Sequence, residues 1–380
     1  MNKNTTNGMA RRTQVAVKKV AFCTATLLVV SICLSSSALA VNKSPRAAVG
    51  KITIEVDPRV ELISIVFRLA GSPEYNDGIL RPYVKAIEKH FGDYDNHPVV
   101  KLASQLRHNR SMSCDGPMSL AVHIDRSFRP RKSFSQWPWG LDYRWEKDET
   151  AEFLEQLRDF AAETEFDAFF KSQSGLYEQG VRSCEGLLAP LQLENWFCGF
   201  FGVDDCGELK LVLGFVNGFS NYGPRFASEG TNEKYAIIGM RPFDPDNTPM
   251  FRPVQIATTV HEFCHSFVNP VVKKHMDQMQ PAAEKLFATH GPAMRMRGYQ
   301  KWESVMYETG VRACVASFIR HSFEPMYLDY YLKDEAKAGF LWTEHMGNVL
   351  KTYDGARDKY PTFESFFPEF VIRLNAYCKA

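Results

Sequence analysis

The sequence places two histidines four residues apart, His261 and His265, in a stretch that contains neither proline nor glycine, residues 256–268. Side chains at this spacing lie about 40° apart around an α-helix and one turn apart along it, so both imidazole rings can approach the same ion. The same stretch carries one acidic residue, Glu262, and no lysine or arginine, whereas a solvated helix normally carries several charges. These residues therefore predict a buried helix with three polar side chains, for which the fold has to supply partners.

A zinc ion is the partner that this pattern favours. Neutral imidazole is a common zinc ligand, and catalytic zinc sites have three protein ligands and leave a fourth position to water. Glu262 follows the first histidine, where its carboxylate can reach the water rather than the metal and act as general base. His261, Glu262 and His265 thus form the H-E-x-x-H pattern of zinc hydrolases. The alternative is a pair of core histidines with a capping or salt-bridged glutamate, which would leave costly unsatisfied polar groups.

A third zinc ligand is expected from the helix predicted over residues 299–321, where two glutamates compete. Glu303 and Glu308 are five residues apart and so point about 140° away from each other, which lets only one of them face the metal. Glu303 could instead occupy a solvated first turn. Glu308 could instead form a salt bridge with Arg312, one turn further on. Helix geometry leaves the choice between the two glutamates open.

The first forty residues have the pattern of a secretory signal peptide. Basic residues precede an apolar run, residues 20–34, and Ala38-Leu39-Ala40 provides a small-x-small cleavage site. The run is short for a membrane span and contains hydroxyl residues, so an uncleaved anchor is the second interpretation. We expect cleavage after Ala40 and a secreted or periplasmic protein.

Charge and cysteine content exclude some classes of function. The signal segment holds five of the 45 basic residues and none of the 44 acidic ones, which leaves a net charge of −4 on the remainder. This balance gives no basic stripe for nucleic acid. Seven of the nine cysteines follow the signal segment, and none is spaced as C-x-x-C. Because seven is odd, at least one thiol stays free or pairs between chains, and a structural zinc ribbon has no support.

The chain after the signal segment exceeds the size at which one hydrophobic core stops growing, so two lobes are expected. A proline disfavours helix at the residue before it, and Asn269-Pro270 is therefore the expected boundary. Residues 41–269 would form a mixed α/β lobe that ends in the motif helix, and residues 270–380 would form a helical lobe. The substrate would lie in the cleft between them.

Hydrophobic periodicity predicts a mostly helical chain with a few strands. The expected strands are residues 50–57, 209–215 and 235–240, and residues 118–124 fit either a strand or a buried helix. The expected helices are residues 60–70, 80–91, 98–107, 149–171, 177–200 with a break near Ala189-Pro190, 253–268, 271–287, 299–321 and 340–353. Residues 129–142, which contain prolines and tryptophans, and the Gly/Asn/Ser-rich residues 218–230 are expected loops.

Two further predictions concern the surroundings of the metal. Strand 235–240 precedes the motif and could pair with a substrate backbone by strand addition, or it could be an ordinary buried strand. Donors to a developing oxyanion would come from later side chains, each of which could instead pack in the core: Tyr307, Tyr327, Tyr330, Tyr331 and His321.

The sequence around the motif resembles a known family. Residues 261–270 are HEFCHSFVNP, and residues 308–313 are ETGVRA. Together with residues 60–63 and 96–99, these segments resemble the secreted bacterial family called domain of unknown function 4932, and the resemblance spans most of the mature chain. It implies a zincin-like metallopeptidase of the gluzincin type, in which a glutamate is the third zinc ligand.

This resemblance favours Glu308 as the third ligand. Gly310 and Ala313, in the same segment, would let its helix approach the motif helix closely enough for a carboxylate to reach the ion. Arg312 would then orient or screen the ligand.

We therefore expect an α+β, mostly helical, zincin-like fold and an exported zinc-dependent hydrolase, in first place a metallopeptidase. His261, His265 and Glu308 would hold Zn²⁺, and a zinc-activated water would cleave peptide bonds with Glu262 as general base. Two alternatives stay open: a catalytically inactive zinc-containing binding or structural protein, and a zinc amidase or esterase acting on non-peptide substrates. The expected partner is a peptide or protein substrate, with no nucleic acid and no stable membrane insertion after signal cleavage.

Overall fold

A computed structural model describes residues 46–49, 52–78, 80–241 and 246–379 of the chain. The predicted signal segment, residues 1–40, and its cleavage site lie outside the described residues. Within the described ranges, no helix is long and apolar enough to cross a membrane.

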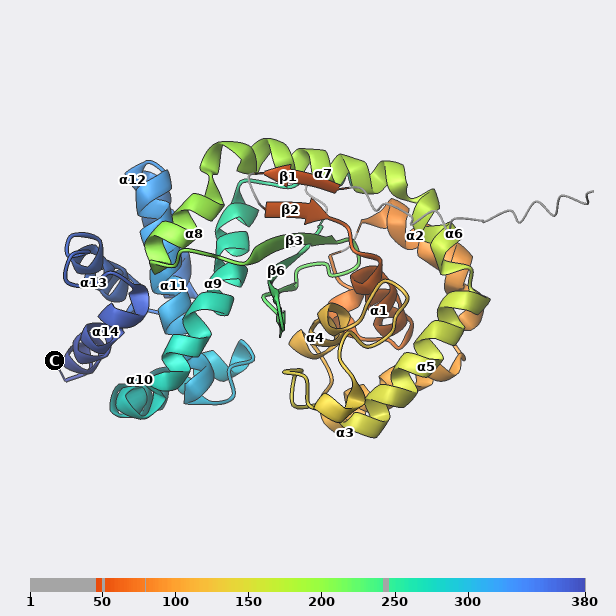
Figure 1. Ribbon diagram of the computed structural model, residues 1–380, viewed down its shortest axis with the longest axis horizontal. Helices are drawn as coiled ribbons and strands as arrows, with labels where there is room; N and C mark the ends of the chain where they lie inside the picture. The colour runs from red at the N-terminus through yellow and green to blue at the C-terminus, as the bar shows by residue number, and fades with distance from the viewer. Residues whose placement is uncertain (1–45, 50–51, 79, 242–245, 380) are drawn as a thin grey trace, which may run out of the picture. The chain divides into compact units, whose positions relative to one another are not determined.

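A small mixed sheet is built from segments far apart in the sequence (Figure 1). Its strands are β1 Arg46–Val49, β2 Ile52–Glu55, β3 Glu208–Gly214, β4 Asn221–Tyr222, β5 Arg225–Ser228 and β6 Thr231–Gly239. The strand order is β1-β2-β3-β6-β4, and β5 also pairs with β6. Neighbours among β2, β3 and β6 are parallel, whereas β1, β4 and β5 pair antiparallel with their neighbours. Strands β3 and β6 are buried along most of their length, as parallel strands covered on both faces usually are.

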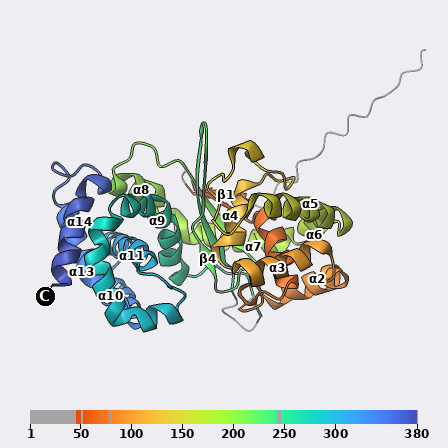
Figure 2. The same ribbon diagram turned by 90° about the horizontal axis from the view of Figure 1, so that it is seen from below.

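Helices surround this sheet. Those before β3 are α1 Pro58–Leu69, α2 Arg81–Phe91, α3 Pro98–Arg110, α4 Asp115–His123, α5 Lys147–Glu163, α6 Phe166–Ser172, α7 Ser174–Leu188 and α8 Leu193–Phe201. Those after β6 are α9 Val254–Lys274, α10 Met276–Met296, α11 Trp302–Ser322, α12 Pro325–Lys337, α13 Thr343–Asp354 and α14 Phe363–Tyr377. Helix α7 lies over β1 and β2, α9 lies along β6, and α11 packs against α9, α10, α12 and α13. Figure 2 shows α10, α13 and α14 on one side of the strands and α2, α3 and α5 on the other.

The predicted fold class, α+β and mostly helical, is confirmed, and the differences lie in single elements. Residues 118–124 belong mainly to helix α4 and not to a strand. The helix predicted over residues 149–171 is divided by Glu165, whose φ of 49° is left-handed, into α5 and α6. The predicted break in residues 177–200 is present between α7 and α8. Helices α12 and α14 and the short strands β4 and β5 are not predicted by the sequence patterns.

The motif helix α9 ends later than the sequence predicts. It includes Pro270 and runs to Lys274, so the break before α10 falls at His275. A proline inside a helix lacks an N–H, and its ring opposes the carbonyl of the residue four positions earlier, which costs about 3 kcal/mol. Packing of α9 against β6 and α11 offsets this local cost. The division of the chain into two lobes stays a prediction, with its expected boundary inside a helix.

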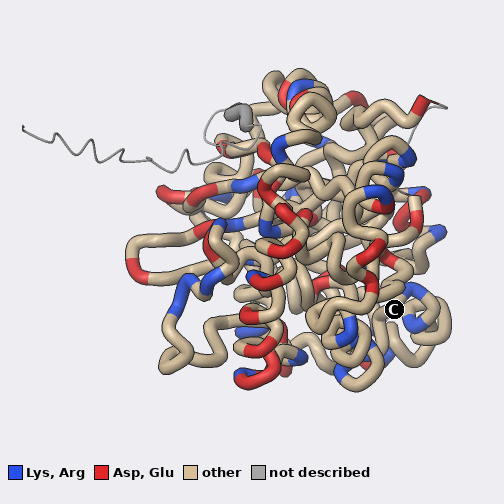
Figure 3. The backbone as a smooth tube through the Cα atoms, turned by 90° about the vertical axis from the view of Figure 1, so that its right-hand side faces the viewer, with Lys and Arg blue, Asp and Glu red and all other residues tan. Residues whose placement is uncertain are grey.

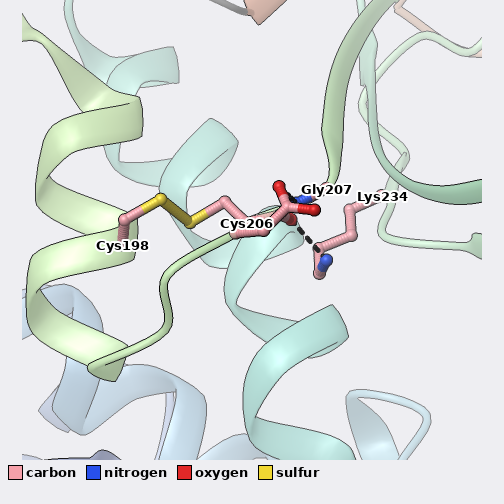
Figure 4. The surroundings of a disulfide bond; sticks show 5 residues. Cys198, Cys206, Gly207 and Lys234 are labelled. Atoms are coloured by element: carbon pink, nitrogen blue, oxygen red, sulfur yellow. Dashed lines mark hydrogen bonds between the residues drawn. A yellow bond between two sulfur atoms is a disulfide. The ribbon is translucent and has the colours of Figure 1, made fainter.

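One disulfide joins α8 to the segment before β3. Cys198 near the end of α8 is bonded to Cys206, as Figure 4 shows. The Lys234 Nζ of β6 donates to the backbone carbonyl of Cys206, which ties the same segment to the sheet. The other cysteines of the described chain are free: Cys114, Cys184, Cys264, Cys314 and Cys378. These five thiols are available to stay free or to pair between chains, as the odd number of cysteines predicts for at least one of them.

Candidate metal centre

Helix α9 presents the motif from a buried position beside the sheet. Phe263 and Cys264 are fully buried, and the Phe263 ring packs edge-on against Phe197 of α8. On the neighbouring side, the backbone carbonyl of Glu262 faces Gly223, where an added Cβ would lie 2.2 Å from that oxygen. Only glycine lets the chain after β4 pass this close to the helix. The helix is thereby held between the core and the edge of the sheet.

The structure brings His261, His265 and Glu308 together. The Nε2 atoms of the two histidines lie 3.2 Å apart. Glu308 of α11 places Oε2 3.4 Å from His261 Nε2 and Oε1 3.5 Å from His265 Nε2. Among the described residues, these three side chains form a group whose possible metal-ligating atoms converge. Glu303, the competing glutamate, is not part of it.

Helix α11 can approach α9 closely because residue 310 is glycine. A Cβ added to Gly310 would lie 2.7 Å from Val268 Cγ1 and 3.3 Å from Val272 Cγ2, both on α9. Ala313, one turn further along α11, is fully buried. The small residue at the contact therefore brings the Glu308 carboxylate within reach of the histidines.

Arg312 supports the carboxylate of Glu308. Its Nη2 lies 2.9 Å from Glu308 Oε2, and its Nη1 pairs with Glu335 of α12. Nη2 also donates to the Tyr299 hydroxyl over 3.1 Å, and the guanidinium carbon lies 4.0 Å from the centre of the Phe340 ring. The arginine is thus fixed on several sides, and it orients the Glu308 carboxylate.

The surroundings of His261 and Glu308 set protonation states that suit a metal. Burial lowers the pKa of His261 to about 3, so the ring is neutral near pH 7. Burial opposes ionisation of Glu308, but the charge of Arg312 and the two histidines outweigh it and lower the pKa of Glu308 to about 2. Imidazole and carboxylate bind metals in these deprotonated forms.

Asn269 orients the ring of His265. Its Oδ1 lies 3.2 Å from His265 Nδ1. When Nδ1 carries the proton and donates it to the amide oxygen, Nε2 keeps its lone pair and directs it toward His261 and Glu308. Asn269 thus selects the tautomer that a metal ligand needs.

Glu262 lies beside the group of three and outside it. Its side chain is buried and lines the same cavity as the histidines. Burial raises the pKa of Glu262 well above its ordinary value, and the negative charges of Glu308 and Asp115 raise it further. A raised pKa makes the carboxylate of Glu262 a stronger base, which suits a group that accepts a proton.

The group opens into a cavity of about 1150 Å³. Its walls come from α9, α11, the first residues of α4 and the chain around β4. Two of the predicted oxyanion donors, Tyr307 and Tyr331, line it. Tyr327 and Tyr330 are exposed and do not line this cavity, and neither does His321.

The strand that the sequence offers for substrate pairing is not at the edge of the sheet. Strand β6, which contains most of residues 235–240, is paired with β3 on one side and with β4 and β5 on the other. Its backbone groups are already used, so the prediction of strand addition to it is wrong and the alternative, a buried strand, is right. The edge beside the cavity is β4, where Asn221 and Tyr222 line the wall.

Several cavity residues escape the sequence patterns: Asp115, Tyr222, Tyr299 and Glu335. They come from α4, β4, the connection between α10 and α11, and α12. No periodicity relates them to the motif, because tertiary packing alone brings these elements to one cavity. The helical pattern of residues 325–337, had it been used to predict α12, is the local signal that could have pointed to Glu335.

Comparison with known proteins gives the family. Residues 142–373 match the family described as Domain of unknown function (DUF4932), and the chain belongs to this family. The matched region includes the motif and Glu308, whereas Asp115 of α4 lies before it. The family resemblance found in the sequence is confirmed. No curated protein and no solved structure matches the chain.

Proposed function

We propose that this protein is an exported zinc-dependent hydrolase with a zincin-like site, in first place a metallopeptidase with a glutamate as third ligand. The observation that carries the proposal is the convergence of His261 Nε2, His265 Nε2 and the Glu308 carboxylate at the floor of an open cavity.

The separations of these atoms fit zinc. Zinc bonds to imidazole nitrogen and carboxylate oxygen are about 2.0–2.2 Å long, so two ligands at the corners of a tetrahedron lie about 3.3–3.5 Å apart. Here the two Nε2 atoms lie 3.2 Å apart, and His261 Nε2 and His265 Nε2 lie 3.4 Å and 3.5 Å from the two different oxygens of the Glu308 carboxylate. Two nitrogens and one carboxylate also form one of the usual ligand sets of catalytic zinc. The donor set and the spacing therefore support the same ion.

The residues around the proposed zinc position would have separate roles in hydrolysis. When bound, zinc lowers the pKa of a water ligand to about 7 and polarises the scissile carbonyl. Glu262 is placed on the cavity wall to accept the proton that the attacking water gives up and to pass it to the departing amine. Arg312 holds Glu308, and Asn269 holds His265, so that both ligands keep their orientation.

Export is the second part of the proposal. It rests on the signal-peptide pattern of residues 1–40, and the Cys198–Cys206 disulfide supports it, because disulfides persist mainly in oxidising compartments. Mass spectrometry of the exported protein is expected to find Val41 at the amino terminus. A mature chain that keeps residues 20–34 would establish the anchored form instead.

Digestion of a mixed peptide library by the purified protein tests the function. We expect cleavage that a chelator abolishes and added Zn²⁺ restores, with close to one zinc per chain. Bound zinc without any cleavage would identify a binding or structural protein. Activity confined to small amides or esters would identify a hydrolase of non-peptide substrates. A protein that takes up no zinc would contradict the whole proposal.

A further inference from the structure

One face of α9 forms the length of a cavity wall. The lining residues recur every three or four positions: Val254, Thr258, His261, His265, Asn269 and Lys273. Side chains at this spacing share one face of a helix. Because a helix rises about 1.5 Å per residue, this face is about 28 Å long from Val254 to Lys273. The candidate metal centre lies between its two ends.

Strand β6 runs along α9 in the opposite direction. At the start of the helix, Gln255 Nε2 donates to the backbone carbonyl of Gly239, the last residue of β6. Further along the helix, Lys234 Nζ, from the first half of β6, lies 4.8 Å from the centre of the Phe267 ring. Increasing residue numbers in α9 therefore correspond to decreasing ones in β6.

The edge of the sheet consequently runs in the same direction as α9. Strands β4 and β5 are antiparallel to β6, so the chain from Phe219 to Arg225 follows α9 from its start toward its end. Gly223 marks the midpoint, because it touches the carbonyl of Glu262. Phe219 thus lies toward the Val254 end of the cavity, and Arg225 lies on the Lys273 side of the metal centre.

The two ends of the cavity differ in chemistry. At the first end, Phe219 and Val254 line the wall although 60% and 61% of their surfaces are exposed. Large apolar side chains left open in a cavity wall favour an apolar ligand group. Arg241 packs near the Phe219 ring, with its guanidinium carbon 5.3 Å from the ring centre, but does not line the cavity.

The other end is basic. Arg225 and Lys273 line the cavity there and are exposed, and Arg297 lies on a wall formed by the connection between α10 and α11. Within the described parts of the chain, none of the three forms an ion pair with an acidic side chain; Arg297 donates to the backbone carbonyl of Lys337. On the side of the molecule seen in Figure 3, by contrast, acidic and basic residues are mixed along the backbone.

Among the described residues, the acidic side chains that line the cavity form no ion pair with these three basic ones. Glu308 and Glu335 share Arg312, and Asp142 pairs with Arg144 over 2.7 Å. Asp115, in the first turn of α4, lines the cavity as well. The positive charges beyond the centre are therefore available to a ligand.

We propose that the cavity binds an extended peptide with an apolar side chain on one side of the scissile bond and an acidic group on the other. This inference rests on the proposed peptidase function and names its substrate class. Lys273 lies eight residues beyond His265, about 12 Å, and Val254 lies seven residues before His261, about 10 Å. An extended peptide advances about 3.3 Å per residue, so the selected groups stand about three to four residues from the scissile bond.

Peptide binding to the zinc-loaded Glu262→Gln protein tests the inference without depending on turnover. Three fluorescent decapeptides share a leucine on one side of the central bond and carry two Glu, two Gln or two Lys on the other. At low salt, the Glu peptide is expected to bind about tenfold more tightly than the Lys peptide, because two or three exposed charge pairs each contribute a few tenths to 1 kcal/mol. Arg225→Glu combined with Lys273→Glu reverses this order.

Lys351→Glu is the matched control, because Lys351 is an exposed residue of α13 outside the cavity. It is expected to leave the order of the three peptides unchanged. Phe219→Ser weakens all three alike, since it acts at the apolar end. Equal affinities for the Glu and Lys peptides, or an order that the double reversal does not alter, would overturn the inference.

The proposed function and this inference fail in different ways. If the parent protein cleaves peptides regardless of their charge, the peptidase function is supported and the proposed charge selectivity is contradicted. A Glu262→Gln protein that shows the charge preference, beside a parent that cleaves no peptide, supports the selectivity and contradicts the peptidase.

Discussion

Two clusters of buried ionisable side chains differ in how completely the protein satisfies them. In the first, Glu61 of α1 accepts hydrogen bonds from the Tyr83 hydroxyl at 2.7 Å and from the backbone N–H of Phe215 at 2.8 Å. The Tyr83 hydroxyl also shares a hydrogen bond of 2.6 Å with Tyr177. These groups are closed off by their own partners, and none of them lines the cavity of the candidate metal centre.

The second cluster, His261, His265 and Glu308, directs its free electron pairs at one point and opens to a cavity of about 1150 Å³. Both clusters combine burial, charge and shifted pKa values. Burial of charge therefore does not by itself mark a functional site. Convergence of ligand atoms together with access from solvent separates the second cluster from the first.

The largest expected effect is a loss of hydrolysis without a loss of zinc binding. Glu262→Gln should lower hydrolysis by roughly 10²–10⁴, the usual contribution of a positioned general base. Zinc should stay close to one per chain, because Glu262 lies outside the group of ligands. His261→Ala and His265→Ala should abolish both. Metal analysis and cleavage rates measured on the same preparations check this, and a Glu262→Gln protein as active as the parent would disprove the mechanism.

The next prediction separates the two glutamates of α11. Glu308→Ala should weaken zinc binding by more than the roughly 10–100-fold that loss of a supporting residue costs, because a direct ligand is removed. Glu303→Ala, on the first turn of the same helix, is the matched control and should keep the parent affinity. Competition with a chromophoric chelator measures both. If Glu303→Ala loses zinc while Glu308→Ala keeps it, the third ligand is Glu303 and not Glu308.

The first cluster, around Glu61, should affect how the free energy of unfolding depends on pH, and it should not affect zinc binding. Burial raises the pKa of Glu61 from 4.5 to about 7, although the hydrogen bonds from Tyr83 and Phe215 act in the opposite direction. The folded state therefore holds this proton more tightly than the unfolded state does. The stability that the proton contributes is complete below pH 4.5 and is lost as the pH rises to about 7, a change on the order of 3 kcal/mol.

Glu61→Gln should remove this dependence, so that the variant gains stability over the parent between pH 5 and pH 8 while it binds zinc normally. Urea unfolding at both pH values measures the difference. Glu155→Gln, on an exposed position of α5, is the control and should show the slope of the parent. A slope that persists in Glu61→Gln would mean that other groups cause it.

The two clusters also show what the sequence can reveal. The second is predictable because its core is local: two histidines one turn apart on a helix, and a glutamate on a helix with Gly310 two residues beyond it. The helical period places the two histidines without knowledge of the fold, whereas it leaves Glu303 and Glu308 both possible, and the family resemblance favours Glu308. Glu61, by contrast, lies in a helix that the sequence predicts, yet its partners are 22 and 154 residues away. No spacing rule connects such residues.

Elements were missed for equally physical reasons. Strands β4 and β5 lie in a stretch rich in glycine, asparagine and serine, and their pairing with β6 outweighs that local preference. The proline inside α9 predicts an early helix end, which packing against α11 and β6 overrides. Glu335 is not predicted as a site residue because its helix, α12, is not predicted either. In each case a long-range contact decides what the local pattern leaves open or contradicts.

The smallest expected effect concerns Arg312, and it tests whether the second cluster needs a neighbouring side chain to keep its geometry. Arg312 bridges Glu308 and Glu335, so Arg312→Gln alone would leave two buried carboxylates without the cation that they share, which destabilises the fold. The double change Arg312→Gln with Glu335→Gln removes the bridge and keeps the charge balance between the two positions. It should fold, as circular dichroism would check, and bind zinc about 10–100-fold more weakly, because Glu308 is no longer oriented. Arg320→Gln, two turns further along α11, controls for loss of an arginine from the same helix. Parent affinity in the double variant would show that Glu308 holds its geometry without Arg312, and that the two clusters differ even in how they are supported.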